Sequence, residues 1–452
     1  MRLRYFAAGA MLAVVAACGG GGGGGGGGFV PVQTPMALGV TINGAAATAD
    51  SSGAYAVKPG DKVEVTSNQA AGWSSASSIA NAISLNNPSV ADTRWSAQLV
   101  STSASVVSYT ITAKATANAS LSKDAVLKVA PADARNGDYT VFEVNGTQQK
   151  LALNFDTQSY AMTDPAGAVA AGSFSADSAE PGTYVFSNSR ITSAVNAARF
   201  RAGSDAVVGA FPFAVANSNP VSYDVQPFIA ARSFVTAQAQ LDGDYNRFSV
   251  FRMAAGRDST IGSVRIANGG TTFIICNDAT VYAMDQCPQA SQLTYAVTPG
   301  TTPNLWTGTD AANPDPNQRT SSFYMARIGG QNVYLRAANS PSDATTKLLR
   351  VALPASADWP AFTGYGASTT GTWGRTTIAG NSYMRVRTNP DGTTGTSTYV
   401  IEPQLVLMPL GLRSVNVASA DSYFAMQGSK LSVVVGARNP STVGYISFAL
   451  SD

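Results

Sequence analysis

The chain has 452 residues and a formal net charge of +2, and only 12% of its residues are charged. It contains no histidine, which excludes Ser–His–Asp and Cys–His catalysis and removes the commonest ligand of zinc, copper and iron. Without Arg2 and Arg4, 27 basic residues balance 27 acidic ones, so the charge gives no basis for a nucleic-acid partner.

The first 17 residues predict export and removal of a signal peptide. Arg2 and Arg4 precede an apolar run, 7–17, that is too short to span a bilayer. The run ends in Val15-Ala16-Ala17-Cys18, which is an aliphatic residue, two small residues and a cysteine. This stretch resembles the lipobox of bacterial lipoproteins, and the resemblance implies cleavage before Cys18 and acyl chains on that cysteine.

Ten glycines, 19–28, follow the cysteine directly. Glycine pays too much conformational entropy to hold one structure, and as a coil this run spans roughly 16–19 Å. We interpret residues 18–36 as a tether that holds the folded part away from a membrane. Gly19 follows the cysteine at the position where lipoproteins retained in the inner membrane carry aspartate. By the lipobox resemblance we therefore expect an anchor in the cell outer membrane, with the protein facing either the periplasm or the outside.

Cysteine usage predicts one disulfide. Of the three cysteines, Cys18 is assigned to lipid, which leaves Cys276 and Cys287 as a pair in an oxidising compartment. A disulfide that closes a loop of this length stabilises the folded state by roughly 3 kcal/mol in the chain-entropy model. The spacing is not Cys-x-x-Cys, so we expect a structural staple and not a redox centre.

Residues 37–132 predict a first all-β domain. Short alternating runs recur about every ten residues, with turn signals such as Asn43-Gly44 and Pro59-Gly60-Asp61 between them. About seven strands in this length resemble an immunoglobulin-like sandwich, with Trp73 at the position of its buried tryptophan. One stretch, 76–85, is the best candidate in the chain for a helical turn or two.

The remainder predicts an internal repeat of β modules, which we place at 136–236, 241–354 and 364–452. Each module is expected to open with a tight turn and an aromatic that begins a strand, namely Tyr139, Tyr245 and Trp373. Such units fit either small up-and-down barrels or sandwiches. The predicted fold class is therefore all-β, with an N-terminal immunoglobulin-like sandwich followed by two or three antiparallel β-barrel or β-sandwich modules.

The glycine-x-aromatic openings resemble those of lipocalin- and avidin-like barrels. In lipocalins an arginine near the last strand packs across the aromatic ring of the first. By this resemblance Arg232 is expected over Tyr139 and Arg350 over Tyr245, while the third closing strand carries no arginine.

Function is predicted only by class. We expect a non-enzymatic, outer-membrane-anchored binding protein, whose partners are the membrane through its lipid and an envelope glycan, a small apolar ligand or a protein. Trp306, Trp359 and Tyr365 lie in Pro- or Gly-rich stretches and are candidates for sugar stacking on exposed rings. No metal or cofactor is predicted. The alternatives are a structural or adhesion spacer and a glycan hydrolase, which requires two facing carboxyl groups.

Overall fold

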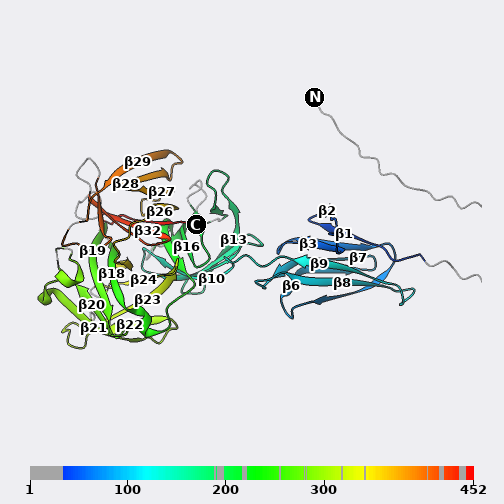
Figure 1. Ribbon diagram of the computed structural model, residues 1–452, viewed down its shortest axis with the longest axis horizontal. Coiled ribbons are helices and arrows are strands. Elements are labelled where there is room, and N and C mark those ends of the chain that lie inside the picture. The colour runs from blue at the N-terminus through cyan, green and yellow to red at the C-terminus, as the bar shows by residue number, and fades with distance from the viewer. Residues whose placement is uncertain are drawn as a thin grey trace, which may run out of the picture.

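The computed structural model describes residues 34–187, 190, 198–215, 221–253, 256–278, 280, 282–316, 319–340, 343–404, 406–416, 422–436 and 444–452. The predicted signal peptide, Cys18 and the glycine run lie outside these residues. Within them the chain forms a β-sandwich at one end and three closed β-barrels gathered at the other (Figure 1). The predicted all-β class is confirmed, and of the two architectures expected for the modules the structure shows barrels. No helix in the described part is long and apolar enough to cross a membrane.

The sandwich consists of two sheets. Its strands are β1 (Leu38–Ile42), β2 (Ala45–Ala46), β3 (Ala54–Val57), β4 (Lys62–Ser67), β5 (Ala71–Ser77), β6 (Ile83–Ala91), β7 (Arg94–Ser101), β8 (Val107–Ala115) and β9 (Ser122–Val129). One sheet has the order β2-β1-β4-β7-β6 and the other β3-β9-β8-β5, with β3 and β9 parallel. This order corresponds to the two sheets of an immunoglobulin-like sandwich.

Two local predictions in the sandwich are wrong. The buried tryptophan is Trp95 on β7, which is 3% exposed, while Trp73 lies on β5 and is only partly buried. The indole nitrogen of Trp73 donates to the carbonyl of Ala91, 2.9 Å away, which holds the ring at the sheet edge. Residues 76–85 form the end of β5, the turn after it and the start of β6, and not a helix, because pairing with neighbouring strands outweighs weak local helix propensity.

Barrel 1 is an eight-stranded up-and-down barrel in which β10 pairs with both β11 and β17. Its strands are β10 (Gly137–Glu143), β11 (Gln148–Asn154), β12 (Ser159–Thr163), β13 (Val169–Ala176), β14 (Thr183–Phe186), β15 (Arg199–Ala202), β16 (Ala206–Ala214) and β17 (Tyr223–Ala231). Aromatic rings fill the lumen, including Phe174, Phe186 and Phe200, which stack or meet edge to face.

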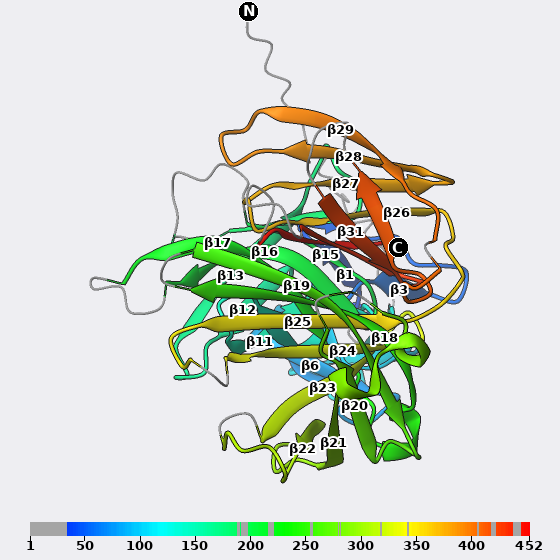
Figure 2. The ribbon, with the colours of Figure 1, turned by 90° about the vertical axis from the view of Figure 1, so that its left-hand side faces the viewer.

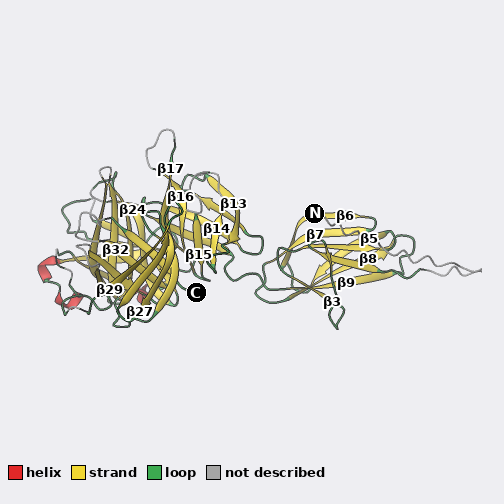
Figure 3. Cartoon of the chain, turned by 90° about the horizontal axis from the view of Figure 1, so that it is seen from above, coloured by secondary structure: helices red, strands yellow, loops and turns green. Residues whose placement is uncertain are grey.

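Barrel 2 repeats this topology. Its strands are β18 (Gly243–Met253), β19 (Gly256–Ala267), β20 (Thr272–Cys276), β21 (Gln292–Pro299), β22 (Leu305–Thr309), β23 (Thr320–Ile328), β24 (Gln331–Asn339) and β25 (Lys347–Pro354). The three short helices of the described chain, η1 (Gln238–Leu241), η2 (Met284–Gln286) and η3 (Gln289–Ser291), all lie next to this barrel (Figure 3). Tyr139 and Tyr245 occupy equivalent places, because each hydroxyl donates to the carbonyl four residues earlier at 2.8 Å.

Barrel 3 is the third closed up-and-down barrel. Its strands are β26 (Phe362–Ala367), β27 (Trp373–Ala379), β28 (Ser382–Thr388), β29 (Thr394–Ile401), β30 (Arg413–Asn416), β31 (Ser422–Gln427), β32 (Leu431–Gly436) and β33 (Ile446–Leu450). The predicted opening at Trp373 is wrong, because this residue begins the second strand and not the first. At the seam β26 runs close to β33, and a β carbon at Gly366 would overlap the carbonyl of Phe448.

The three barrels pack together through one apolar core formed by their outward faces. Along β10, Tyr139 and Val141 belong to the lumen of barrel 1, whereas Phe142, on the opposite face, and Val144, just after the strand, belong to the core between the barrels. This shared core also contains Phe248, Val250, Leu349 and Val351 of barrel 2 and Val433, Ile446, Phe448 and Leu450 of barrel 3. Barrel 3 therefore lies directly against barrel 2 (Figure 2).

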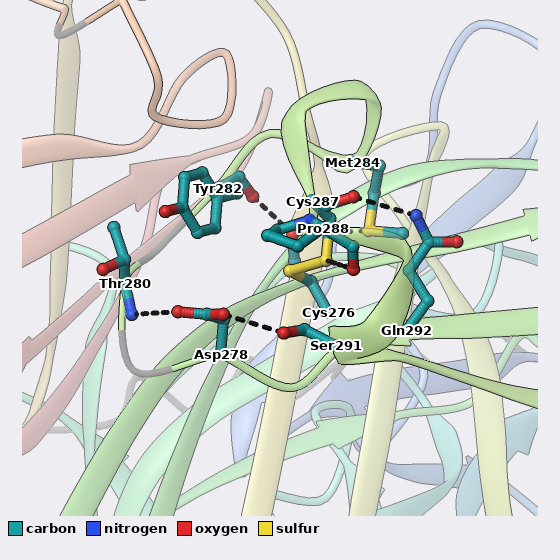
Figure 4. Close-up of a disulfide and its surroundings, with 10 residues drawn as sticks. Cys276, Asp278, Thr280, Tyr282, Met284, Cys287, Pro288, Ser291 and Gln292 are labelled. Atoms are coloured by element: carbon teal, nitrogen blue, oxygen red, sulfur yellow. Dashed lines mark hydrogen bonds between the residues drawn. A yellow bond between two sulfur atoms is a disulfide. The ribbon is translucent and has the colours of Figure 1, made fainter.

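The predicted disulfide between Cys276 and Cys287 is confirmed. It closes the loop between β20 and β21, where the carboxylate of Asp278 accepts from Ser291 at 2.8 Å and the Gln292 amide donates to the Cys287 carbonyl at 3.0 Å (Figure 4). The sulfurs pack with Met284 on the outside of barrel 2. The disulfide fixes a long connection on the surface of barrel 2 and does not enter the lumen of that barrel.

Candidate ligand-binding site

The lumen of barrel 3 is not filled. A cavity of about 300 Å³ lies at the end of the barrel where β28 finishes and β29 begins. Its lining residues are Arg257, Thr369, Thr370, Thr372, Tyr383, Arg385, Arg387, Tyr399, Val415, Tyr423, Val434, Gly444 and Tyr445. The volume lies at the lower end of the range for small-molecule sites.

Strand β28 supplies the centre of the site. Side chains of a strand alternate between its two faces, so Tyr383, Arg385 and Arg387 point to the same side. All three line the cavity. The opposite face of the neighbouring strand β27 carries Arg375, which is exposed to solvent and does not line the cavity.

Four tyrosines form an arc along one wall of the cavity. The ring centres of Tyr383 and Tyr399 are 5.7 Å apart, those of Tyr399 and Tyr423 are 6.1 Å apart, and those of Tyr423 and Tyr445 are 5.4 Å apart. These separations are typical of aromatic pairs that hold one another in place. The arc offers apolar ring faces and hydroxyl groups to the same ligand.

The arginines of barrel 3 are oriented by neighbouring hydroxyl groups. Arg385 donates to the hydroxyl of Tyr445 and, at 3.2 Å, to Oγ1 of Thr372, while Arg387 donates to Oγ of Ser397. Each guanidinium has five N–H donors, so these few bonds orient the group and leave donors for a ligand.

The third arginine comes from a different barrel. Arg257 lies at the start of β19 and donates to the carbonyl of Thr369 at 2.6 Å, with a long contact of 3.4 Å to Oε1 of Gln226 in barrel 1. Gly444 approaches so closely that a β carbon there would overlap the Arg257 side chain. The cavity is thus completed at the junction of three barrels.

The cavity is electropositive. Among the residues that the structure describes, three guanidinium groups and no carboxylate line it. Burial raises the pKa of the Tyr383 hydroxyl to about 12 in spite of the nearby Arg385 cation, so this hydroxyl remains a hydrogen-bond donor at neutral pH. Charge-assisted hydrogen bonds from arginine are strong and suit carboxylate or phosphate groups. This lining can therefore bind an anion.

The three aromatic residues predicted as a sugar platform are not brought together. Trp306 lies on β22 inside barrel 2, is 3% exposed and donates to the carbonyl of Val235 at 3.2 Å. Trp359 packs partly buried against the barrel 3 core under Arg413. Tyr365 lies on β26 beneath Arg201 of barrel 1, 4.9 Å from ring centre to guanidinium carbon. The prediction of exposed rings in loops is wrong for Trp306 and Tyr365, because both belong to strands that pack against other elements.

The two predicted arginine–aromatic contacts have different outcomes. Arg232 lies over Tyr139, 5.5 Å from the ring centre, and this prediction is confirmed. Arg350 does not lie over Tyr245, because it pairs across the sheet with Ser249, four residues farther along β18. Tyr245 pairs instead with Pro354.

The residues that line the cavity were not predicted from the sequence. A signal was present in β28, where Tyr383, Arg385 and Arg387 occupy alternate positions and give one face of the strand an unusual polarity for a barrel lumen. The contribution of Arg257 carried no such signal, since 112 residues separate it from Thr369, to which it donates.

Comparison with known proteins adds little to this geometry. No protein-family model matches the chain, and no curated protein matches it. Among solved structures, a quinonprotein alcohol dehydrogenase-like protein from Bacteroides thetaiotaomicron aligns over 88% of this chain and 95% of its own, with 8% sequence identity and a TM-score of 0.14. A TM-score of 0.14 is too low to indicate a shared fold.

Proposed function

We propose that this protein is a non-enzymatic binding protein of the bacterial cell envelope, held at the outer membrane by lipid on Cys18, and that barrel 3 binds a small anionic ligand. An acidic sugar or a short acidic glycan fits best, because the tyrosine arc offers ring faces for a pyranose and the arginines offer partners for its carboxylate.

The observation that carries this proposal is a cavity whose described lining contains three arginines, four tyrosines and no carboxylate. A small apolar ligand would leave the charges of the guanidinium groups uncompensated and their remaining N–H donors unpaired, which is costly. Glycoside hydrolysis requires two carboxyl groups facing the substrate, and the lining supplies neither. Binding without chemistry is the function that this lining supports.

Calorimetry with D-glucuronate and D-glucose tests the binding proposal, because the two sugars share a ring and differ in the carboxylate. We expect wild type to bind glucuronate and to bind glucose at least tenfold more weakly. Arg387→Gln removes a charge-assisted bond worth about 1.5–3 kcal/mol and should weaken glucuronate binding by at least tenfold. The matched control Arg375→Gln removes an equal charge from the outer face of the next strand and should leave the affinity unchanged. Equal binding of the two sugars, or equal effects of the two substitutions, would contradict the proposal.

The anchor is tested separately by phase partitioning of the full-length protein expressed in a Gram-negative host. Wild type should enter the detergent phase, because several acyl chains bind a membrane far more firmly than one. Cys18→Ala removes the acylation site and should shift the protein to the aqueous phase. If the variant partitions like wild type, the lipid anchor is disproved while the ligand site in barrel 3 is unaffected.

A further inference from the structure

The lumen of barrel 2 contains three arginines on three adjacent strands. They are Arg247 on β18, Arg336 on β24 and Arg350 on β25. Arg336 and Arg350 face each other directly across the sheet, and Arg247 lies one inward position away on the other neighbouring strand. Like charges in directly opposite positions of a sheet are destabilising, so this arrangement requires an explanation.

These arginines have almost no partners within the described part of the chain. Arg336 is 7% exposed and donates from Nη1 to Oγ of Ser321 at 2.5 Å. Arg247 and Arg350 form no hydrogen bond or ion pair with the described residues, and the buried Nε atoms of all three arginines are unpaired. Burial, together with the charges of Arg247 and Arg336, lowers the pKa of Arg350 to about 9. The protein therefore holds three cations together against a clear energetic cost.

Barrel 1 shows that the fold does not need these arginines. The first strands of barrels 1 and 2 can be aligned on their tyrosines, because Tyr139 and Tyr245 each donate to the carbonyl four residues earlier. Two residues after the tyrosine, on the same inward face, barrel 1 has Val141 and barrel 2 has Arg247. Where one barrel has a small apolar side chain, the other has a cation.

The same exchange occurs on the last two strands. Phe228 lies opposite the residue four places after the barrel 1 tyrosine, and Arg350 lies opposite the residue four places after the barrel 2 tyrosine. On the preceding strand Gly209 faces Phe228, and Arg336 faces Arg350. In barrel 1 the Phe228 ring covers Gly209, where a β carbon would lie 2.6 Å from it. Valine, glycine and phenylalanine thus give a packed solution to the positions that barrel 2 fills with three arginines.

The arginine cluster is open to solvent at one end of the barrel. Thr260 pairs with Ser249 and so points to the same inward side, yet it is exposed. Gly262 faces Arg247 across the sheet and brings no side chain into the lumen. Arg247 and Arg350 are themselves partly exposed, so an anion that approaches from the end where Thr260 is exposed can reach the arginines.

We propose that this end of barrel 2 is a second anion-binding site, distinct from the cavity of barrel 3, and that it takes a multiply charged tetrahedral oxyanion such as sulfate or a phosphate monoester group. Three guanidinium groups carry more positive charge than one carboxylate can neutralise and more N–H donors than it can accept hydrogen bonds from. A phosphate or sulfate group accepts several such bonds at once. The site does not depend on the function proposed for barrel 3.

Calorimetry with inorganic pyrophosphate and with sulfate, at constant ionic strength, tests this site. The variant R336G/R350F installs the residues of barrel 1 and should bind one pyrophosphate fewer per chain than wild type. Arg375→Gln, on the outer face of barrel 3, should bind as wild type does. Sulfate in place of pyrophosphate separates a general oxyanion site from one that prefers phosphate.

A second variant guards against misfolding of the double substitution. Arg247→Val also installs the barrel 1 residue and should weaken pyrophosphate binding at this site by at least tenfold while glucuronate binding in barrel 3 is retained. Pyrophosphate should raise the unfolding midpoint of wild type more than that of this variant. Unchanged pyrophosphate stoichiometry and affinity in Arg247→Val would overturn the proposal.

Discussion

At the scale of single residues, Glu143 is the most unusual group outside the two arginine sites. It ends β10 inside barrel 1 and is fully buried. One carboxylate oxygen accepts from the Gln149 amide at 3.1 Å and from the Thr147 hydroxyl, while Oε2 has no partner among the described residues. Burial raises the pKa of the Glu143 carboxyl to about 8, which the neighbouring hydrogen bonds only partly oppose. The carboxyl is thus protonated in the folded chain at neutral pH.

This predicts how the stability of the barrels depends on pH. Between the ordinary pKa of 4.5 and about 8, the folded chain holds a proton that the unfolded chain has released. The contribution of Glu143 is therefore complete below about pH 4.5 and is lost as pH rises to about 8, by up to about 1.4 kcal/mol per pH unit. Glu143→Gln keeps the shape of the protonated group and should remove this slope.

Urea unfolding of wild type and Glu143→Gln at pH 5, 7 and 8.5 measures the effect. The two proteins should differ little at pH 5, and the variant should be the more stable at pH 8.5. If the two stability curves run parallel over this range, Glu143 is ionised in the folded protein and the expectation is wrong.

At the scale of elements, strand register decides which arginine reaches which ring. A strand rises about 3.3 Å per residue, so the four-residue offset between Tyr245 and the partner of Arg350 places them about 13 Å apart along the sheet. In barrel 1 Thr140 pairs with Ala231, which brings the following residue, Arg232, beside Tyr139. Spacing to the end of a closing strand does not define register, and only the pairing itself distinguishes the two cases.

At the scale of the whole molecule, the three barrels share a core that no single barrel encloses. Phe248 is fully buried there, on the outer face of barrel 2, together with residues of barrels 1 and 3. A barrel taken alone would expose this apolar face to water. The three barrels are therefore expected to unfold as one cooperative unit, separately from the sandwich.

Substitution in the shared core tests this cooperativity. Phe248→Ala should reduce the free energy of unfolding by about 3–5 kcal/mol. It should lower the midpoint temperature of a single unfolding transition that includes all three barrels. Leu127→Ala, at a fully buried position of the sandwich, should lower only the sandwich transition. Scanning calorimetry resolves the two, and fluorescence assigns them, since Trp73 and Trp95 lie in the sandwich and Trp306, Trp359 and Trp373 in the barrels. Separate transitions for the individual barrels would contradict a shared core.

The sequence by itself determined the features that are local. Alternation of apolar residues, frequent turn signals and the absence of long helical periods predicted an all-β chain with an immunoglobulin-like domain and repeated barrel or sandwich modules, because these signals depend only on neighbours along the chain. The disulfide between Cys276 and Cys287 followed from the count of cysteines. The position of Arg232 over Tyr139 followed from a family pattern that this barrel happens to keep.

Only the tertiary structure showed how the barrels pack against one another and which arginines it brings together. The strands of the shared core are apolar on both faces, so their sequence does not show which face fills a lumen and which meets another barrel. Arg257 reaches the cavity of barrel 3 from barrel 2, and the arginines of barrel 2 converge from β18, β24 and β25. Both anion sites arise from contacts between residues distant in the chain, and such contacts are set by strand pairing and barrel packing, which local sequence does not specify.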